Sequence, residues 1–113
     1  MSNQTETVIA HTHCARFQRA IELVGRRWTG AIVRMLFVGP QRFNAILGAI
    51  PELSDRLLAE RLKELEGQGL VEREVSPGPP VCVTYALTQA GRELQTALTA
   101  LGAWAEQWIT LDA

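Results

Sequence analysis

The chain has 113 residues, of which 47% are hydrophobic and 20% are charged, and its formal net charge is −1. This length suits one domain with one core, and no apolar run approaches the roughly 18 residues that span a bilayer. Two cysteines are too few for a disulfide scaffold, and no CxxC pair is present to build a zinc site. We therefore expect a cytoplasmic protein without a signal peptide, a metal or a cofactor.

The predicted elements follow a polar N-terminal segment. Residues 1–12 are expected to form a flexible tail, and residues 13–113 a single folded domain. Apolar periodicity, capping residues and Gly or Pro stops predict five helices. They run from Cys14 or Ala15 to Gly25, and over Trp28–Val38, Phe43–Ile50, Ser54–Glu66 and Thr88–Thr110.

Between the last two helices the pattern changes to that of β-strands. Leu70–Val75 and Val81–Leu87 are rich in β-forming residues, and Ser76–Pro80 must turn. A short extended segment, Gln41–Phe43, precedes the third helix. This order predicts an α+β, mainly α fold, the winged helix-turn-helix with a two-stranded β-hairpin as its wing.

The helix-turn-helix is predicted where a short helix, a turn at Pro51 and the Ser54 helix follow one another. In this motif the second helix enters the major groove of DNA and its first residues reach base edges. Charge supports this interpretation: residues 15–63 carry nine Lys or Arg against four acids, whereas residues 64–113 carry two against seven. DNA binding requires local positive potential and not a basic total.

Several spaced motifs resemble the HxlR family of bacterial regulators, relatives of the MarR-type winged-helix proteins. Besides Cys14, eleven residues before Gly25, the motifs are Gly25–Trp28, Gly39–Phe43, Leu57–Glu66, Gly69–Arg73 and Val83–Gly91. The resemblance implies a dimeric DNA-binding repressor or activator, with the first and last helices in the dimer interface. Two departures stand out: the wing has Cys82 where the family often has Arg, and Ala59 replaces a hydroxyl residue of the recognition helix.

The candidate DNA contacts lie mainly on the predicted recognition helix. Arg56 in its first turn is expected to reach a guanine edge or a phosphate, and Lys63 a phosphate. Asp55 is better explained by helix capping, and Arg61 by either an ion pair or a backbone contact. The full set of candidates is Arg42, Ser54, Asp55, Arg56, Ala59, Glu60, Lys63 and Arg73.

The last helix carries a larger apolar stripe than a small monomer can hide, which favours a homodimer. Packing of this stripe on its own domain is the alternative. The residues predicted to form the dimer interface are Phe17, Ile21, Leu98, Leu101, Trp104 and Trp108.

Cys14 is the candidate redox sensor, because a helix N-terminus with His13 and Arg16 nearby favours a reactive thiolate. An inert, buried Cys14 is the alternative. Cys82 is expected to pack in the wing or to serve as a partner thiol. His11, His13 and Cys14 do not have the spacing of a standard zinc site, so no metal is predicted.

The leading hypothesis is thus a sequence-specific transcription regulator that binds a palindromic operator as a homodimer and responds to oxidants or electrophiles. Two alternatives remain: a regulator with an aromatic effector pocket near Phe17, Trp28 and Trp104 at the dimer interface, and a winged-helix protein-interaction module without DNA affinity. An enzyme is not expected, because no catalytic triad, phosphate loop or carboxylate pair is visible.

Overall fold

A computed structural model of the chain describes residues 15–112 and divides the chain into two compact units, residues 1–30 and 31–113. In the first unit, residues 15–24 are helical. The helix ends at Gly25 as predicted, and the Gly25 N–H donates to the Ile21 carbonyl at 2.7 Å. A turn follows, in which the Arg27 guanidinium lies 5.5 Å from the centre of the Trp28 ring.

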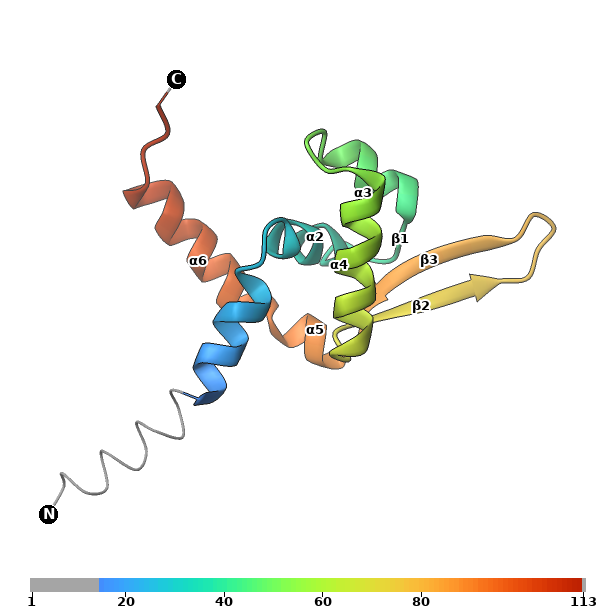
Figure 1. Ribbon diagram of the computed structural model, residues 1–113, viewed down its shortest axis with the longest axis horizontal. Helices are drawn as coiled ribbons and strands as arrows, with labels where there is room; N and C mark the ends of the chain where they lie inside the picture. Colours follow the sequence, from blue (N-terminus) through green and yellow to red (C-terminus); the bar gives the residue numbers. More distant parts are fainter. Residues whose placement is uncertain (1–14, 113) are drawn as a thin grey trace, which may run out of the picture. The chain divides into compact units, whose positions relative to one another are not determined.

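The boundary between the units falls within α2 (Thr29–Leu36), and the second unit holds the elements that follow (Figure 1). The other elements in chain order are β1 (Gln41–Arg42), α3 (Phe43–Ala49), α4 (Asp55–Gly67), β2 (Val71–Ser76), β3 (Cys82–Leu87), α5 (Gln89–Glu93) and α6 (Gln95–Trp108). No helix among residues 15–112 has both the length and the apolar character needed to cross a membrane.

The core is formed where α2, α3 and α4 meet the base of the sheet. Its buried side chains are supplied by the apolar faces that the helical periodicity predicted. They include Ile32, Val33, Leu36, Ile46, Leu58, Leu62, Leu65, Leu70, Val71 and Leu87. Beyond this core the β2–β3 hairpin projects away from the helices as a wing (Figure 1).

Both ends of α4 are fixed by local hydrogen bonds. The Ser54 hydroxyl caps the helix by accepting from the Leu57 N–H at 3.1 Å, as predicted. At the other end Gly69 adopts a φ of 75°, and the Leu70 N–H donates to the Leu65 carbonyl at 2.9 Å. This is the Schellman arrangement, in which a glycine in the left-handed region allows the chain to leave the helix sharply.

The sheet has three strands in the order β1-β3-β2, all antiparallel. The predicted two-stranded hairpin was therefore incomplete, because the extended segment before α3 pairs with β3. Gln41 lies opposite Tyr85 and Arg42 opposite Thr84. The pairing ties the entrance of the helix-turn-helix to the central strand of the wing.

The predicted long final helix is instead two helices, α5 and α6, separated at Leu94. The Thr88 hydroxyl caps α5 by accepting from the Gly91 N–H at 3.3 Å, and it donates to the Gly69 carbonyl at 2.6 Å. The Leu94 N–H then donates to the Gly91 carbonyl at 3.2 Å, the spacing of a tighter turn. The tight turn lets α6 leave in a new direction.

Candidate nucleic-acid interface

The helix-turn-helix consists of α3, a connection over residues 50–54 and α4. Ile50 and Leu53 are buried within this connection. The Leu53 N–H donates to the Ile50 carbonyl at 3.0 Å, which closes the turn around Pro51. α4 is thereby held with its capped N-terminus open to solvent.

One face of α4 is exposed along its length. Arg56, Ala59, Glu60 and Lys63 are all exposed, and their spacing of three or four residues places them on one side of the helix. Leu58, Leu62 and Leu65 on the other side are buried. The predicted recognition residues are therefore brought together on a single solvent-facing surface.

The two cations of this surface lie near opposite ends of α4. Arg56 is in the first turn, and neither it nor Lys63 is hydrogen-bonded or ion-paired with another residue in the described range 15–112. Seven residues of α-helix separate them by about 10 Å along the axis. Both side chains are available to an anionic partner.

Arg61, which the sequence left open, is a structural residue. Arg61 is only 8% exposed, and its guanidinium forms an ion pair with the Glu64 carboxylate at 3.2 Å. A buried arginine paired within its own helix does not face a DNA groove.

The two arginines of the sheet lie on opposite faces. Arg73 of β2 is opposite Tyr85, whereas Arg42 of β1 is opposite Thr84, the next residue along β3. Successive residues of a strand point to alternate faces, and directly opposed residues share one. Both arginines are exposed, but the sheet presents them in different directions.

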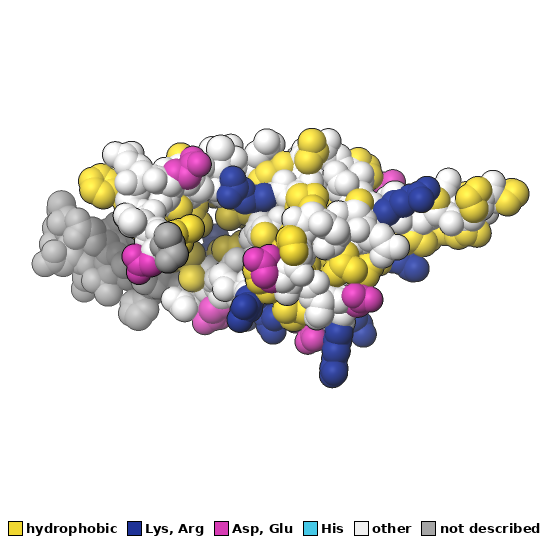
Figure 2. Space-filling view, turned by 90° about the horizontal axis from the view of Figure 1, so that it is seen from above, with side chains coloured by type: hydrophobic (Ala, Val, Ile, Leu, Met, Phe, Trp, Pro, Cys, Tyr) yellow, Lys and Arg dark blue, Asp and Glu magenta, His cyan; other side chains and the backbone are white. Residues whose placement is uncertain are grey.

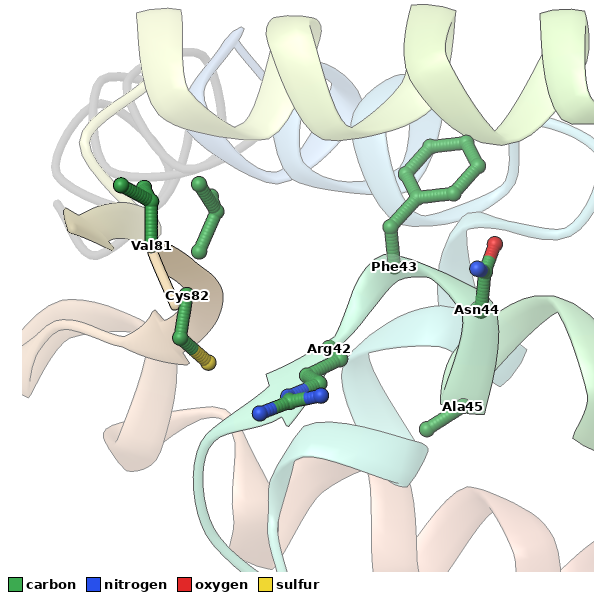
Figure 3. Close-up of a pocket in the computed structure, with 7 residues that line it drawn as sticks. Arg42, Phe43, Asn44, Ala45, Val81 and Cys82 are labelled. Atoms are coloured by element: carbon green, nitrogen blue, oxygen red, sulfur yellow. The ribbon is translucent and has the colours of Figure 1, made fainter. Parts of the chain in front are cut away.

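Arg42 shares its face with the one cysteine of the described range 15–112, Cys82. The two side chains are directed into the same open pocket of about 310 Å³, which Phe43, Asn44 and Val83 also line (Figure 3). Cys82 is half-buried, so the predicted packing role in the wing fits its position. Cys14 lies outside the described residues.

The tip of the wing carries no charged side chain. Residues 76–81 are Ser, Pro, Gly, Pro, Pro and Val, and all of them are exposed. Figure 2 shows only hydrophobic and uncharged atoms at the far end of the wing. The charges of the hairpin are instead on β2, where Glu72, Arg73 and Glu74 follow one another.

Apolar side chains are exposed on α6. Leu101, Trp104 and Trp108 are 55%, 53% and 67% exposed, and their spacing places them on one face of the helix. Leu98 is 7% exposed, so it is buried within the single chain. In the first unit, considered by itself, Phe17 and Ile21 are also exposed.

Residues 15–112 contain no group of three or more His, Cys, Asp or Glu side chains arranged to hold a metal ion. The exposed candidate residues on α4 and the sheet include the cations Arg42, Arg56, Lys63 and Arg73. A family model described as HxlR-like helix-turn-helix matches residues 23–113. The chain belongs to this family.

Its relatives are transcription regulators. The chain is 46% identical over 96 residues to the uncharacterised HTH-type transcriptional regulator YvaP of Bacillus subtilis, covering 85% of this chain and 89% of YvaP. It is 45% identical over 100 residues to the HTH-type transcriptional regulator YodB of the same organism, covering 88% and 89%.

Solved structures agree with these relationships. The reduced form of YodB superposes with a TM-score of 0.79 at 44% identity, covering 88% of this chain and 98% of YodB. Diamide-treated and quinone-bound YodB give TM-scores of 0.73 and 0.74. The oxidised form of the redox regulator HypR gives 0.79 at 31% identity, covering 87% and 99%.

The HxlR-family chain described here is thus a MarR-like winged-helix transcription regulator and not an enzyme. The predicted family and fold class are confirmed. Sequence reasoning did not identify Gln41 as a residue in register with Tyr85 and Arg73, because a strand of two residues has no pattern in the sequence that predicts its pairing with β3.

Proposed function

We propose that this HxlR-family regulator binds a palindromic operator as a homodimer, and that reaction of Cys14 with an oxidant or electrophile changes its DNA affinity. The exposed face of α4, with Arg56 in the first turn behind the Ser54 cap, carries the DNA-binding part of the proposal. Such a helix places its N-terminal side chains against base edges in the major groove. The regulator acts in the cytoplasm, where its operator lies.

The candidate contacts divide by chemistry. Arg56 donates two hydrogen bonds to a guanine edge, and Lys63 and Arg42 donate to phosphates. Ala59 meets a thymine methyl group and Glu60 accepts from a cytosine amine. Ser54 and Asp55 act mainly by capping α4, because the Ser54 hydroxyl already accepts from the Leu57 N–H.

Replacement of Arg56 tests this assignment. Loss of a bidentate base contact costs about 1–3 kcal/mol, so Arg56→Ala should weaken operator binding roughly 5- to 150-fold and relax one base position. Arg56→Lys is the matched control: it keeps the charge, so binding to random duplex should survive while discrimination at that base is lost. Fluorescence anisotropy on operator and random duplexes measures both. Unchanged affinity of Arg56→Ala for every sequence contradicts the proposal.

Salt dependence separates DNA binding from the protein-interaction alternative. Release of counterions from neutralised phosphates makes the logarithm of DNA affinity fall linearly with the logarithm of salt concentration. We expect this slope for the wild type on both duplexes. A protein that binds neither duplex at low salt would instead be an interaction module.

The homodimer is supported by the exposed apolar face of α6. Leu101, Trp104 and Trp108 form a stripe too large to remain in water on an isolated domain of this size. Phe17 and Ile21 of the first unit are exposed apolar side chains as well. Leu98, in contrast, is buried in its own chain. Two-fold symmetry then requires half-sites about one helical turn apart.

Sensing through Cys14 is supported by the solved relatives, since YodB has reduced, diamide-treated and quinone-bound structures. We expect diamide or benzoquinone to release the wild type from its operator but to leave Cys14→Ser bound. The chain has two cysteines, so Cys82→Ser is the matched control and should respond as the wild type does. An equal response of wild type and Cys14→Ser excludes Cys14 and favours the aromatic effector pocket.

A further inference from the structure

The register of the sheet places three hydrogen-bond donors in one row across its strands. Arg73 of β2 and Gln41 of β1 both lie opposite Tyr85 of the central strand β3. Directly opposed residues share a face, so the three side chains stand side by side on one surface. Two spacings between neighbouring strands give this row a width of about 10 Å.

The face that bears the row has no acidic side chain. The other residues on it are Val71, Val75, Val83 and Leu87, as the register shows. Glu72 and Glu74 alternate with Arg73 and therefore point to the opposite face. Strand β2 is thus divided by charge, with Arg73 on one side and both carboxylates on the other, while Arg42 of β1 shares the face of the carboxylates.

Each face of the sheet packs on the domain at its base, where Val71 and Leu87 of the Arg73 face and Ala86 of the acidic face are buried. Glu72 and Glu74 line an open pocket of about 230 Å³ together with Leu36, Phe37 and Arg92. The Arg92 guanidinium donates to the Leu87 carbonyl at 2.8 Å and is held at this pocket. The pocket therefore belongs to the side of the sheet on which the end of α2 and Arg92 of α5 lie.

We propose that Arg73, Tyr85 and Gln41 form a phosphate-binding row, and that the wing meets DNA with this face and not with the face of Glu72 and Glu74. The inference rests on the DNA binding proposed above and assigns the part of the wing that performs it. A guanidinium, a phenol and an amide are donors that commonly hold phosphate oxygens. None of the three side chains has a hydrogen-bond or ion-pair partner among residues 15–112.

The row explains how a wing with an uncharged tip holds DNA. Arg73 is the only Lys or Arg between Val71 and Leu87 in the sequence. It lies three residues before Ser76, the end of β2, or about 10 Å along the strand. The contact with phosphate is therefore made by the paired strands of the hairpin, and the uncharged tip, Ser76–Val81, takes no part in it. Carboxylates in the same place would repel the backbone of DNA.

Two substitutions on the row and one on the opposite face test the assignment. Arg73→Ala should weaken binding to operator and random duplex alike, about tenfold, and lower the magnitude of the salt slope by about 1. Tyr85→Phe removes only the hydroxyl and should weaken both about three- to tenfold. Glu72→Gln, next to Arg73 but on the other face, should change affinity by less than about twofold.

The measurement is fluorescence anisotropy at several salt concentrations, with thermal unfolding run in parallel to show that each variant is folded. If Arg73→Ala and Tyr85→Phe both bind DNA with wild-type affinity while Arg56→Ala binds more weakly, the phosphate-binding row is wrong. The proposed function is then unaffected. A larger effect of Glu72→Gln than of Arg73→Ala overturns the choice of face. Absence of DNA binding by the wild type itself contradicts the proposed function.

Discussion

The junction between the recognition helix and α5 depends on Gly91. A Cβ atom there would overlap the Leu70 carbonyl oxygen and lie 2.9 Å from the Leu87 Cδ2 atom. Gly91→Ala therefore has to push α5 away from the end of α4, where the Thr88 N–H donates to the Leu70 carbonyl at 3.0 Å and the Thr88 hydroxyl to the Gly69 carbonyl at 2.6 Å.

The magnitude follows from these contacts. Overpacking costs about 1–3 kcal/mol and each weakened hydrogen bond about 1 kcal/mol, so we expect Gly91→Ala to lower the free energy of unfolding by about 2–4 kcal/mol. Urea unfolding followed by tryptophan fluorescence measures it, at one protein concentration because the proposed dimerisation adds to apparent stability.

Gly48→Ala is the matched control for Gly91→Ala. Gly48 also lies within a short helix, but it is exposed, whereas Gly91 is buried. Nothing lies within 4 Å of the position that a Cβ atom on Gly48 would take. Alanine there should raise the free energy of unfolding by about 0.5–1 kcal/mol, because it reduces the entropy of the unfolded chain. If the two alanine variants differ by less than about 1 kcal/mol, the close approach of α5 to Leu70 is not a constraint on the fold.

Two further predictions concern the N-terminal cap of α4 and the exposed apolar face of α6. Ser54→Ala removes the cap of α4 and should lower the free energy of unfolding by about 1 kcal/mol in the same urea titration, and unchanged stability would show that the cap is not needed. Trp104→Lys should convert the proposed homodimer to a monomer at micromolar concentration in light scattering, since it puts a charge into the apolar face of α6. Val38→Lys is its control, because Val38 is 83% exposed outside α6; a dimeric Trp104→Lys would exclude this face as the interface.

The parts of the fold that the sequence predicted are those set by local chemistry. The Ser54 hydroxyl caps the start of α4 by accepting from the Leu57 N–H, and Gly69 ends the helix in the left-handed region. Both effects act within one helical turn, so the local sequence is enough to predict them. The exposed face of α4 also follows from sequence, since three leucines at helical spacing fix the opposite side.

Features set by tertiary contacts escaped prediction. β1 has two residues, and only its pairing with β3 makes it a strand. The break at Leu94 lies just after Gly91, which approaches Leu70, a residue distant in sequence. The role of Arg61 required knowledge of its burial, because an exposed and a buried arginine at the same helical position have the same sequence pattern.

The position of Cys82 makes the wing accessible to spectroscopy. Cys82 lies on the face opposite the Arg73 row, lines an open pocket and is unpaired. In a Cys14→Ser background it is the single thiol of the chain. An environment-sensitive dye attached there would report movement of the wing from the face opposite Arg73, beside Arg42.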